Sequence, residues 1–358
     1  MTTVVSGASR RGYIDWLRGI LVLIMIEAHT LDAWTRLDAR QNGAYGWAMI
    51  VGGFGAPGFL FLAGIAVALA AGSRMRRGRT PEEAAALARR RALQIFGLAF
   101  LFRLQSWAIS GGDPAQALLK VDILNIMGLS MLAAAVLWGL GRFRWDRFAW
   151  LVGATVFVAM ITPIVRSSPW FSPLPDPIEW YIRPIPGRGT FTLFPWAGFL
   201  LAGTAVGLWL DSARAPDDER RINIAFAALG IVLAAAAYGA SFLPAIYREA
   251  SFWTTSPTFF FLRLGILILS LPVAYAWNRV WMGRSFLQEF GRASLFIYWI
   301  HVELAYGVLS SPIHKSLTLG QAFLAYALFT IALFGAAKLK DQIVDWWNVG
   351  RLQPSGAL

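Results

Sequence analysis

Long apolar runs recur along the chain, and short polar segments rich in Arg, Pro or Gly separate them. An α-helix rises 1.5 Å per residue, so about 20 apolar residues cross the roughly 30 Å hydrocarbon core of a bilayer. Counting the runs predicts ten membrane-spanning helices, and hence an all-α, polytopic integral membrane protein. The predicted spans are residues 16–35, 46–72, 90–110, 118–140, 147–165, 191–210, 222–243, 257–277, 290–310 and 319–340.

Basic residues concentrate in alternate loops. The loops on one side hold 21 Lys and Arg residues, and those on the other side hold eight. The positive-inside rule then places both termini in the cytoplasm, which requires an even number of spans. This bias explains the net charge of +12, so we expect membrane lipids and no nucleic acid among the partners. We expect one transmembrane domain over residues 1–358, with cytoplasmic tails at 1–12 and 341–358.

Few side chains are suited to chemistry. The absence of Cys excludes disulfides, a thiol nucleophile and thiolate metal ligands. The three His residues lack HxxxH or HxxE spacing, so we expect no bound metal. His29 and His301 lie in predicted spans and are suited to proton transfer near neutral pH. His314 follows in an outer loop, and we expect no role for it.

The first predicted span carries ionisable groups along one face. Arg18 and His29 are eleven residues apart, which is three helical turns plus about 20°, with a rise of about 16 Å. Asp15 and Asp32 lie three residues outside this pair on nearly the same ridge, whereas Glu27 points away from His29. Ionisable groups within a membrane are costly and usually functional, so this face is the first candidate site.

Polar residues of several other spans lie at a similar depth. With the termini inside, they fall in the outer part of the membrane: Arg103, Asp122, Asn125, Arg263, His301 and Glu303. Each one alone is explained by a buried ion pair or a hydrogen-bonded core position. Together they favour a polar cavity, because uncompensated charge in hydrocarbon is expensive. We predict that His301 joins the face of His29 if the ninth predicted span packs against the first.

Three further segments have local signatures. Thr80 to Glu83 has the pattern of a helix start that continues into the third predicted span. The Pro-rich loop 163–190 cannot be helical throughout, and it is either a stiff connector or a lid over the outer face. The glycines of 52–58 indicate close packing and an irregular start of a span, because no strand precedes them and no Lys-Ser or Lys-Thr follows.

Five blocks of sequence resemble known membrane acyltransferases. Arg18 and His29 resemble the Arg-x10-His signature of the acyltransferase-3 superfamily. The ordered set resembles bacterial relatives of the heparan-α-glucosaminide N-acetyltransferase catalytic domain. The blocks are IDWLRGI at 14–20, GAPGFLFLAG at 55–64, VDILNIMG at 121–128, FPWAG at 194–198 and SLFIYWIHVE at 294–303. In one departure, the eukaryotic enzyme has Asn at the position of His29 and places its proposed catalytic His where this chain has Arg40. Catalysis by His29 therefore rests on the acyltransferase-3 pattern, and heparan specificity does not carry over.

The resemblance implies transfer of an acyl group, usually acetyl, from cytosolic acyl-CoA to a sugar or glycan on the outer side of a bacterial inner membrane. It implies His29 as general base, with Asp32 orienting it or binding the acceptor, and Asn125, Tyr298 or His301 donating to the oxyanion. Asp122 completes the candidate catalytic set. The candidate cofactor-binding residues are Arg18, Arg89, Arg90, Arg91, Arg103 and Tyr298. The run Arg89–Arg91 is equally explained by topology and anionic lipid.

Other functions fit the same pattern. Buried ionisable residues in ten spans also suit a proton-coupled secondary transporter or a lipid-linked sugar flippase. A structural subunit is a third reading, against which the layer of polar residues argues. The sequence leaves open the acceptor, the acyl chain, O- or N-transfer, direct transfer or an acyl-histidine, and a monomer or homodimer.

Overall fold

The computed structural model describes residues 11–110, 114–187, 189, 191–281, 283 and 285–352. Over these residues the regular secondary structure is helical, with no strand beyond two isolated bridges. Eight helical segments are long and apolar enough to cross a membrane. They are Gly43–Arg76, Pro81–Ile109, Ile123–Leu140, Arg144–Ser167, Leu193–Leu210, Pro216–Ala240, Pro257–Val280 and Leu319–Trp347. The chain is therefore an all-α, multi-pass membrane protein.

Two of the ten predicted spans differ from these eight. Helix α1 (Gly12–Trp34) has 23 residues, enough to span, but carries four charged residues and so is not apolar enough. The predicted span 290–310 consists of two short helices, α11 (Phe286–Arg292) and α12 (Ser294–Tyr306), which meet at Ala293. With 13 residues, α12 rises only about 20 Å, less than the hydrocarbon thickness.

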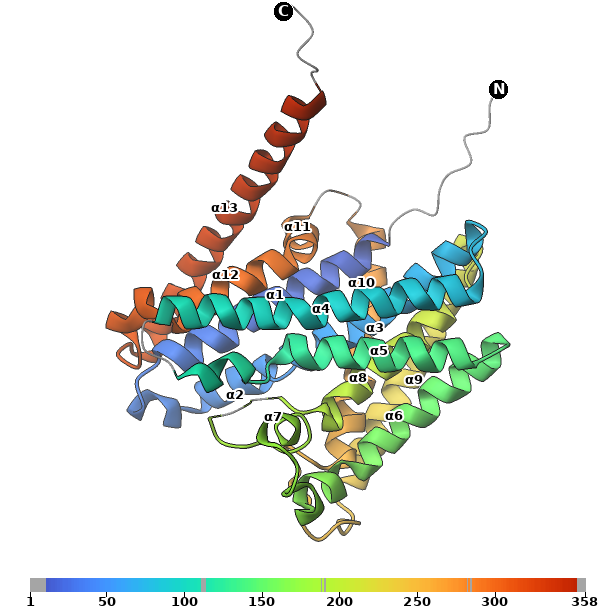
Figure 1. Ribbon diagram of the computed structural model, residues 1–358, viewed down its shortest axis with the longest axis horizontal. Helices are drawn as coiled ribbons and strands as arrows, with labels where there is room; N and C mark the ends of the chain where they lie inside the picture. The colour runs from blue at the N-terminus through green and yellow to red at the C-terminus, as the bar shows by residue number, and fades with distance from the viewer. Residues whose placement is uncertain are drawn as a thin grey trace, which may run out of the picture. The chain divides into compact units, whose positions relative to one another are not determined.

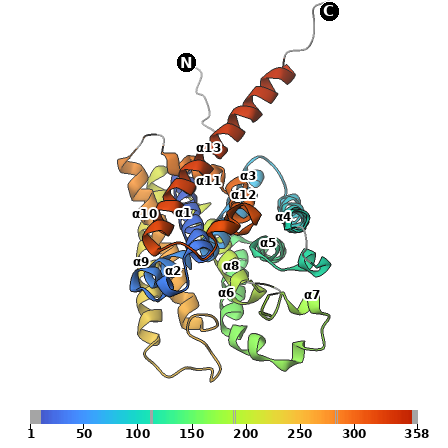
Figure 2. The same cartoon turned by 90° about the vertical axis from the view of Figure 1, so that its left-hand side faces the viewer.

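The described helices group into two compact units. One unit joins the N-terminal residues up to Gly55 to the C-terminal residues from position 282 (Figure 1, blue and orange to red). Its further elements are η1 (Asp38–Gln41), α2 (Gly43–Gly52), η4 (Val308–Ile313) and α13 (Leu319–Leu352). Within it, α1 contacts α2, α11, α12 and α13, while the C-terminal half of α13 extends away from the other helices (Figure 2).

Helices α1 and α11 cross at backbone contact. A Cβ atom on Gly19 would lie 2.0 Å from the carbonyl oxygen of Leu287, and one on Gly291 would lie 1.9 Å from that of Asp15. Residue numbers rise along α11 as they fall along α1, so the two helices are antiparallel here. In contrast, His301 and Tyr306 of α12 meet successively later residues of α1, so α12 runs parallel to α1. The chain thus reverses direction near Ala293.

The second unit covers Ala56–Trp281. Its elements are α3 (Gly55–Arg76), α4 (Pro81–Ser110), η2 (Ala115–Leu119), α5 (Ile123–Leu140), α6 (Arg144–Ser167), η3 (Pro169–Phe171), α7 (Asp176–Glu179), α8 (Leu193–Leu210), α9 (Pro216–Ala240) and α10 (Pro257–Val280). Helix α4 packs along α5, α6 along α8, and α9 along α10. The best buried candidate span is α8, with 72% of its most apolar window buried.

Three local predictions are confirmed in the helix boundaries. Thr80 and Glu83 form reciprocal side-chain to backbone hydrogen bonds of 3.2 and 3.1 Å, and α4 continues from this cap to Ser110. Helix α2 ends at Gly52 and α3 begins at Gly55, so the glycine-rich segment does start its span irregularly. In its described residues, the Pro-rich loop contains only the short helices η3 and α7 after α6 ends.

Candidate active site

The centre of the first unit is a pair of histidines from opposite ends of the sequence. The Nδ1 atom of His29 on α1 lies 2.8 Å from Nε2 of His301 on α12. The two rings are nearly parallel, with centroids 5.0 Å apart and planes inclined by 16°. His301 is fully buried at 0% exposure. The predicted packing of the segment containing His301 against the first helix is therefore confirmed.

Backbone carbonyls of α12 hold the other side of the His301 ring. Its Nδ1 atom lies 2.9 Å from the carbonyl oxygen of Ile297 and 2.9 Å from that of Tyr298. These residues precede His301 by four and three positions, so the contact is a local consequence of the helix. The Tyr298 ring also meets the His301 ring edge-on, with centroids 5.8 Å apart.

Tyr306, Asp32 and Arg40 form a second layer beside His29. The Tyr306 ring meets the His29 ring edge-on at 5.7 Å, and its hydroxyl donates to Oδ2 of Asp32 at 2.9 Å. Arg40 Nη1 lies 3.4 Å from Oδ1 of Asp32, and its other nitrogens donate to the backbone oxygens of Thr35 and Asp32. A cation on these carbonyls stabilises the C-terminal end of α1. The partners of Asp32 are thus Tyr306 and Arg40.

A pocket of about 250 Å³ opens next to this layer. Its lining residues are Asp32, Ala33, Arg40, Tyr306, His314 and Lys315. Lys315 has a φ of +51°, which costs energy for a residue with a side chain, and its N–H donates to Ala33 O at 2.9 Å. The segment after α12 is thereby tied to the end of α1. The pocket combines a carboxylate, two cations and a phenol, a set that can bind a small polar ligand.

The remaining predicted residues of α1 lie away from this pocket. Arg18 Nη1 pairs with Oδ1 of Asp15 at 3.1 Å near the start of the helix. Glu27 lies beside Gly52 of α2, which confirms that it points away from His29. Its Oε2 atom is buried and has no hydrogen-bond partner among the described residues.

Asp122 and Asn125 lie in the second unit and form the cap of α5. Asp122 Oδ1 accepts from the backbone N–H groups of Leu124 and Asn125 at 2.9 and 3.3 Å, and Asn125 Oδ1 accepts from the Asp122 N–H at 3.0 Å. Asp122 Oδ2 lies 3.3 Å from Nη2 of Arg103, and Asn125 Nδ2 donates to the Tyr181 hydroxyl at 3.1 Å. This geometry gives both residues a structural role, and their part in catalysis stays a prediction.

Tyr181 connects this cluster to the Pro-rich loop. Burial raises the pKa of Tyr181, which keeps the phenol neutral at physiological pH. Its backbone oxygen accepts from the Leu193 N–H at 2.7 Å, and the neighbouring Trp180 is buried with Val121 and Ile126. The loop is therefore packed on the start of α5.

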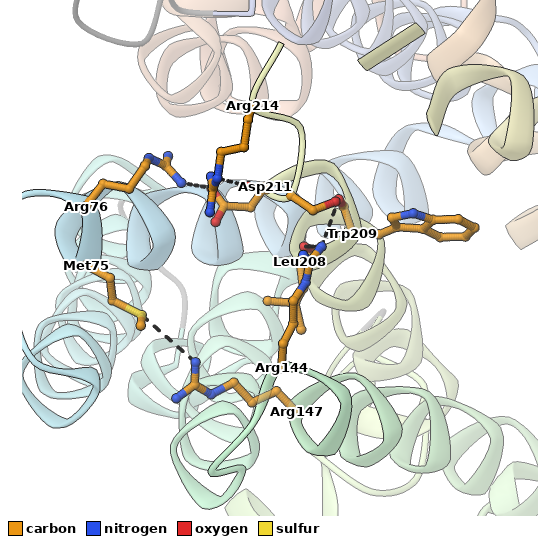
Figure 3. A network of polar contacts seen from close by, with 9 residues as sticks. Met75, Arg76, Arg144, Arg147, Leu208, Trp209, Asp211 and Arg214 are labelled. Atoms are coloured by element: carbon orange, nitrogen blue, oxygen red, sulfur yellow. Dashed lines mark hydrogen bonds and ion pairs between the residues drawn. The ribbon is translucent and has the colours of Figure 1, made fainter. Parts of the chain in front are cut away.

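The arginines of the second unit lie in two groups. Arg89 is half-buried and Arg90 and Arg91 are exposed on α4, where Arg91 donates to Gln94 at 3.3 Å. A second group of arginines surrounds the end of α8 (Figure 3). Arg144 donates to the Leu208 and Trp209 carbonyls at 2.8 and 3.2 Å.

Asp211 is the anionic centre of this second group. Arg76 pairs with its carboxylate at 2.6 Å, and Arg214 donates to its backbone oxygen at 3.0 Å (Figure 3). Arg147 stacks on the Trp138 ring at 4.0 Å. Positive charge at these positions offsets the partial negative charge of the α8 C-terminus. The sequence did not predict that these arginines meet, because nothing in their spacing indicates a shared helix end.

Sequence reasoning also missed Tyr306 and the pocket-lining role of His314 and Lys315. His314 Nε2 lies 2.9 Å from Ser310 Oγ and 3.1 Å from the Ala305 carbonyl. The one available signal was Arg40, which the family resemblance marked as a departure. Among the described residues, no group of three or more His, Asp and Glu side chains is placed to hold a metal ion.

The fold and this site define a multi-pass helical membrane protein in which the buried His301 contacts the half-buried His29 beside a polar pocket. Residues 10–232 match the family described as "Heparan-alpha-glucosaminide N-acetyltransferase, catalytic", and the chain belongs to this acetyltransferase family. The matched range includes Arg18 and His29 and ends within α9, so His301 lies beyond it. No curated protein matches the chain.

Proposed function

We propose that the protein transfers an acyl group, normally acetyl, from cytosolic acyl-CoA to a hydroxyl or amine of an extracytoplasmic sugar or glycan, with His29 as general base. We place it in a bacterial inner membrane with both termini in the cytoplasm. The observation that carries the proposal is the His29–His301 contact next to the pocket at the end of α1. Membership of an acetyltransferase family supports the reaction class.

The proposed reaction is a direct transfer. His29 takes the proton of the acceptor O–H or N–H as that atom bonds to the thioester carbonyl carbon. The tetrahedral intermediate collapses with cleavage of the C–S bond, and the CoA thiolate leaves and takes the proton back from His29. Asp32 is held by Tyr306 and Arg40 rather than by His29, so we assign it to acceptor binding.

The contacts of the other candidate residues limit the roles that they can take. His301 has both ring nitrogens hydrogen-bonded, so it does not donate to an oxyanion without losing a structural contact. Asn125 uses Oδ1 in the cap of α5 and one N–H of Nδ2 towards Tyr181. We assign the CoA phosphates to Arg90 and Arg91, which are exposed. Arg18 and Arg103 are already paired with Asp15 and Asp122.

The test uses purified full-length protein with labelled acetyl-CoA. Acetyl-CoA at ten times its Kd should stabilise the protein by about 1.4 kcal/mol, and label should pass to a sugar acceptor. His29→Ala should keep CoA binding and lose transfer, whereas Trp346→Ala, an exposed position on α13, should match wild type. If acetyl-CoA at millimolar concentration neither binds nor stabilises the protein, the proposal is wrong.

The buried histidine pair also favours one alternative, a proton-coupled transporter or a lipid-linked sugar flippase. That function predicts sugar uptake into proteoliposomes driven by a pH gradient, and loss of uptake in His29→Ala. Uptake without acetyl transfer would select it over the acyltransferase.

A further inference from the structure

The hydrogen bonds of the histidine pair determine which nitrogens carry protons. Carbonyl oxygens accept only, so the Nδ1 atom of His301, which faces the carbonyls of Ile297 and Tyr298, must carry hydrogen. A neutral His301 then has its lone pair on Nε2. Because that atom lies 2.8 Å from Nδ1 of His29, the hydrogen between the rings belongs to His29. The second nitrogen of a neutral His29, Nε2, is left with a lone pair.

We infer that His301 is a positioning residue that holds His29 in its Nδ1–H tautomer and so makes Nε2 of His29 the atom that accepts the acceptor's proton. This inference rests on the proposed acyl transfer. The arrangement persists through the reaction, because a protonated His29 still donates from Nδ1 to His301. A proton on Nε2 of His301 would instead face the Nδ1–H of His29, and two N–H groups cannot form a hydrogen bond with each other. The proton taken from the acceptor therefore stays on His29.

The groups around the pair leave this role to His301. Asp32, three residues after His29, is engaged by Tyr306 and Arg40. Tyr306 contacts His29 through its ring edge and directs its hydroxyl to Asp32. Glu27 lies on the other side of α1, beside Gly52. Among these neighbours, His301 alone accepts a hydrogen bond from the Nδ1–H of His29.

The first test compares three substitutions at position 301. His301→Ala removes the hydrogen-bond acceptor for the Nδ1–H of His29. We expect kcat to fall about 100-fold or more, as when a catalytic histidine loses its orienting partner. The KM for acetyl-CoA should stay unchanged. His301→Gln places a carbonyl oxygen as many bonds from Cα as Nε2, and should recover at least about 10-fold of that loss. His301→Asn reaches only the position of Nδ1, and should stay as impaired as the Ala variant.

The second test reads the tautomer directly in the wild-type protein. The chain has three His residues, so ¹⁵N-histidine labelling gives three ring systems, and the signals lost in His29→Gln identify His29. We expect a pyrrole-type Nδ1 and a pyridine-type Nε2 for His29. The opposite pattern would overturn the inference, as would a folded His301→Ala protein with wild-type kcat.

The two proposals can fail separately. If wild type shows the expected tautomer but transfers no acetyl group, the tautomer assignment stands, whereas acyl transfer and the role of Nε2 in it fail. If wild type transfers acetyl while His29 carries its proton on Nε2, acyl transfer stands and the positioning role of His301 is wrong. The wild-type spectrum needs no acyl donor and no variant at position 301, so misfolding of the position 301 variants cannot hide either result.

Discussion

The contact between α1 and α11 makes a quantitative prediction for Gly291→Ala. The added Cβ would lie 1.9 Å from the Asp15 carbonyl oxygen, and such contacts do not occur below 3.0 Å, so the backbones must separate by about 1 Å. Overpacking of this kind costs about 1–3 kcal/mol, and the higher helix propensity of Ala returns up to about 1 kcal/mol. Because backbone cannot rotate aside as a side chain can, we expect a net loss of about 2 kcal/mol.

The assay is thermal unfolding of the detergent-solubilised protein, followed by intrinsic Trp fluorescence. For a chain of 358 residues, a loss of about 2 kcal/mol should lower Tm by about 3 °C. Gly335→Ala on α13 is the matched control, because nothing lies within 4 Å of its Cβ, and its Tm should stay equal or rise. If Gly291→Ala is as stable as the control, the helices do not cross at backbone contact.

A double substitution sharpens this test. Gly19→Ala creates a similar overlap with the Leu287 carbonyl oxygen, at 2.0 Å, on the same pair of helices. One separation of α1 from α11 relieves both overlaps, so Gly19→Ala with Gly291→Ala should cost less than the sum of the two single changes. Additive losses of stability would show that the structure relaxes independently at the two sites and that the helices do not move as rigid bodies.

Three other predictions follow from single contacts. Tyr306→Phe keeps the ring against His29 but removes the hydrogen bond to the half-exposed Asp32, which is worth about 1 kcal/mol. In the acetyl-transfer assay the KM for the acceptor should rise about 5-fold while CoA binding is unchanged, and an unchanged KM would exclude Asp32 from the acceptor site. Asp122→Ala removes the cap of α5 and the partner of Arg103, so the free energy of unfolding measured by thermal unfolding should fall by at least about 1 kcal/mol. Asp122→Asn should lose less stability because Asn can still cap the helix, and equal losses would mean that the cap contributes nothing. Glu27→Gln should leave Tm equal or higher, because it replaces a buried carboxyl oxygen that has no hydrogen-bond partner among the described residues. Glu27→Lys should lower Tm, and a large fall in Tm for Glu27→Gln would indicate that the charge is needed.

The sequence predicted features that depend on neighbouring residues along one helix. The shared face of Arg18 and His29 followed from the helical repeat, and the cap at Thr80 followed from residue types at fixed spacing. The end of α8, with Arg144 and Asp211, was not predictable in this way, because its contacts join residues more than 60 positions apart. Likewise, the hydropathy of residues 290–310 reports their apolar character but not the reversal at Ala293.

That reversal explains how residues 286–306 contact α1 from Asp15 to Asp32. Straight helices that cross at an angle diverge within a few turns, so a single helix over 290–310 would meet only part of α1. Instead, α11 runs antiparallel past Asp15 and Gly19, and after the turn α12 runs parallel past His29 and Asp32. The contact of Gly291 with the Asp15 backbone holds α11 in place. Gly291→Leu, which forces α11 away from α1, should therefore disturb the His29–His301 hydrogen bond more than Gly335→Leu does, because nothing lies within 4 Å of a Cβ at Gly335, and the ¹⁵N-histidine spectrum measures both effects. Equal spectra for the two variants would mean that the turn and the histidine pair are set independently.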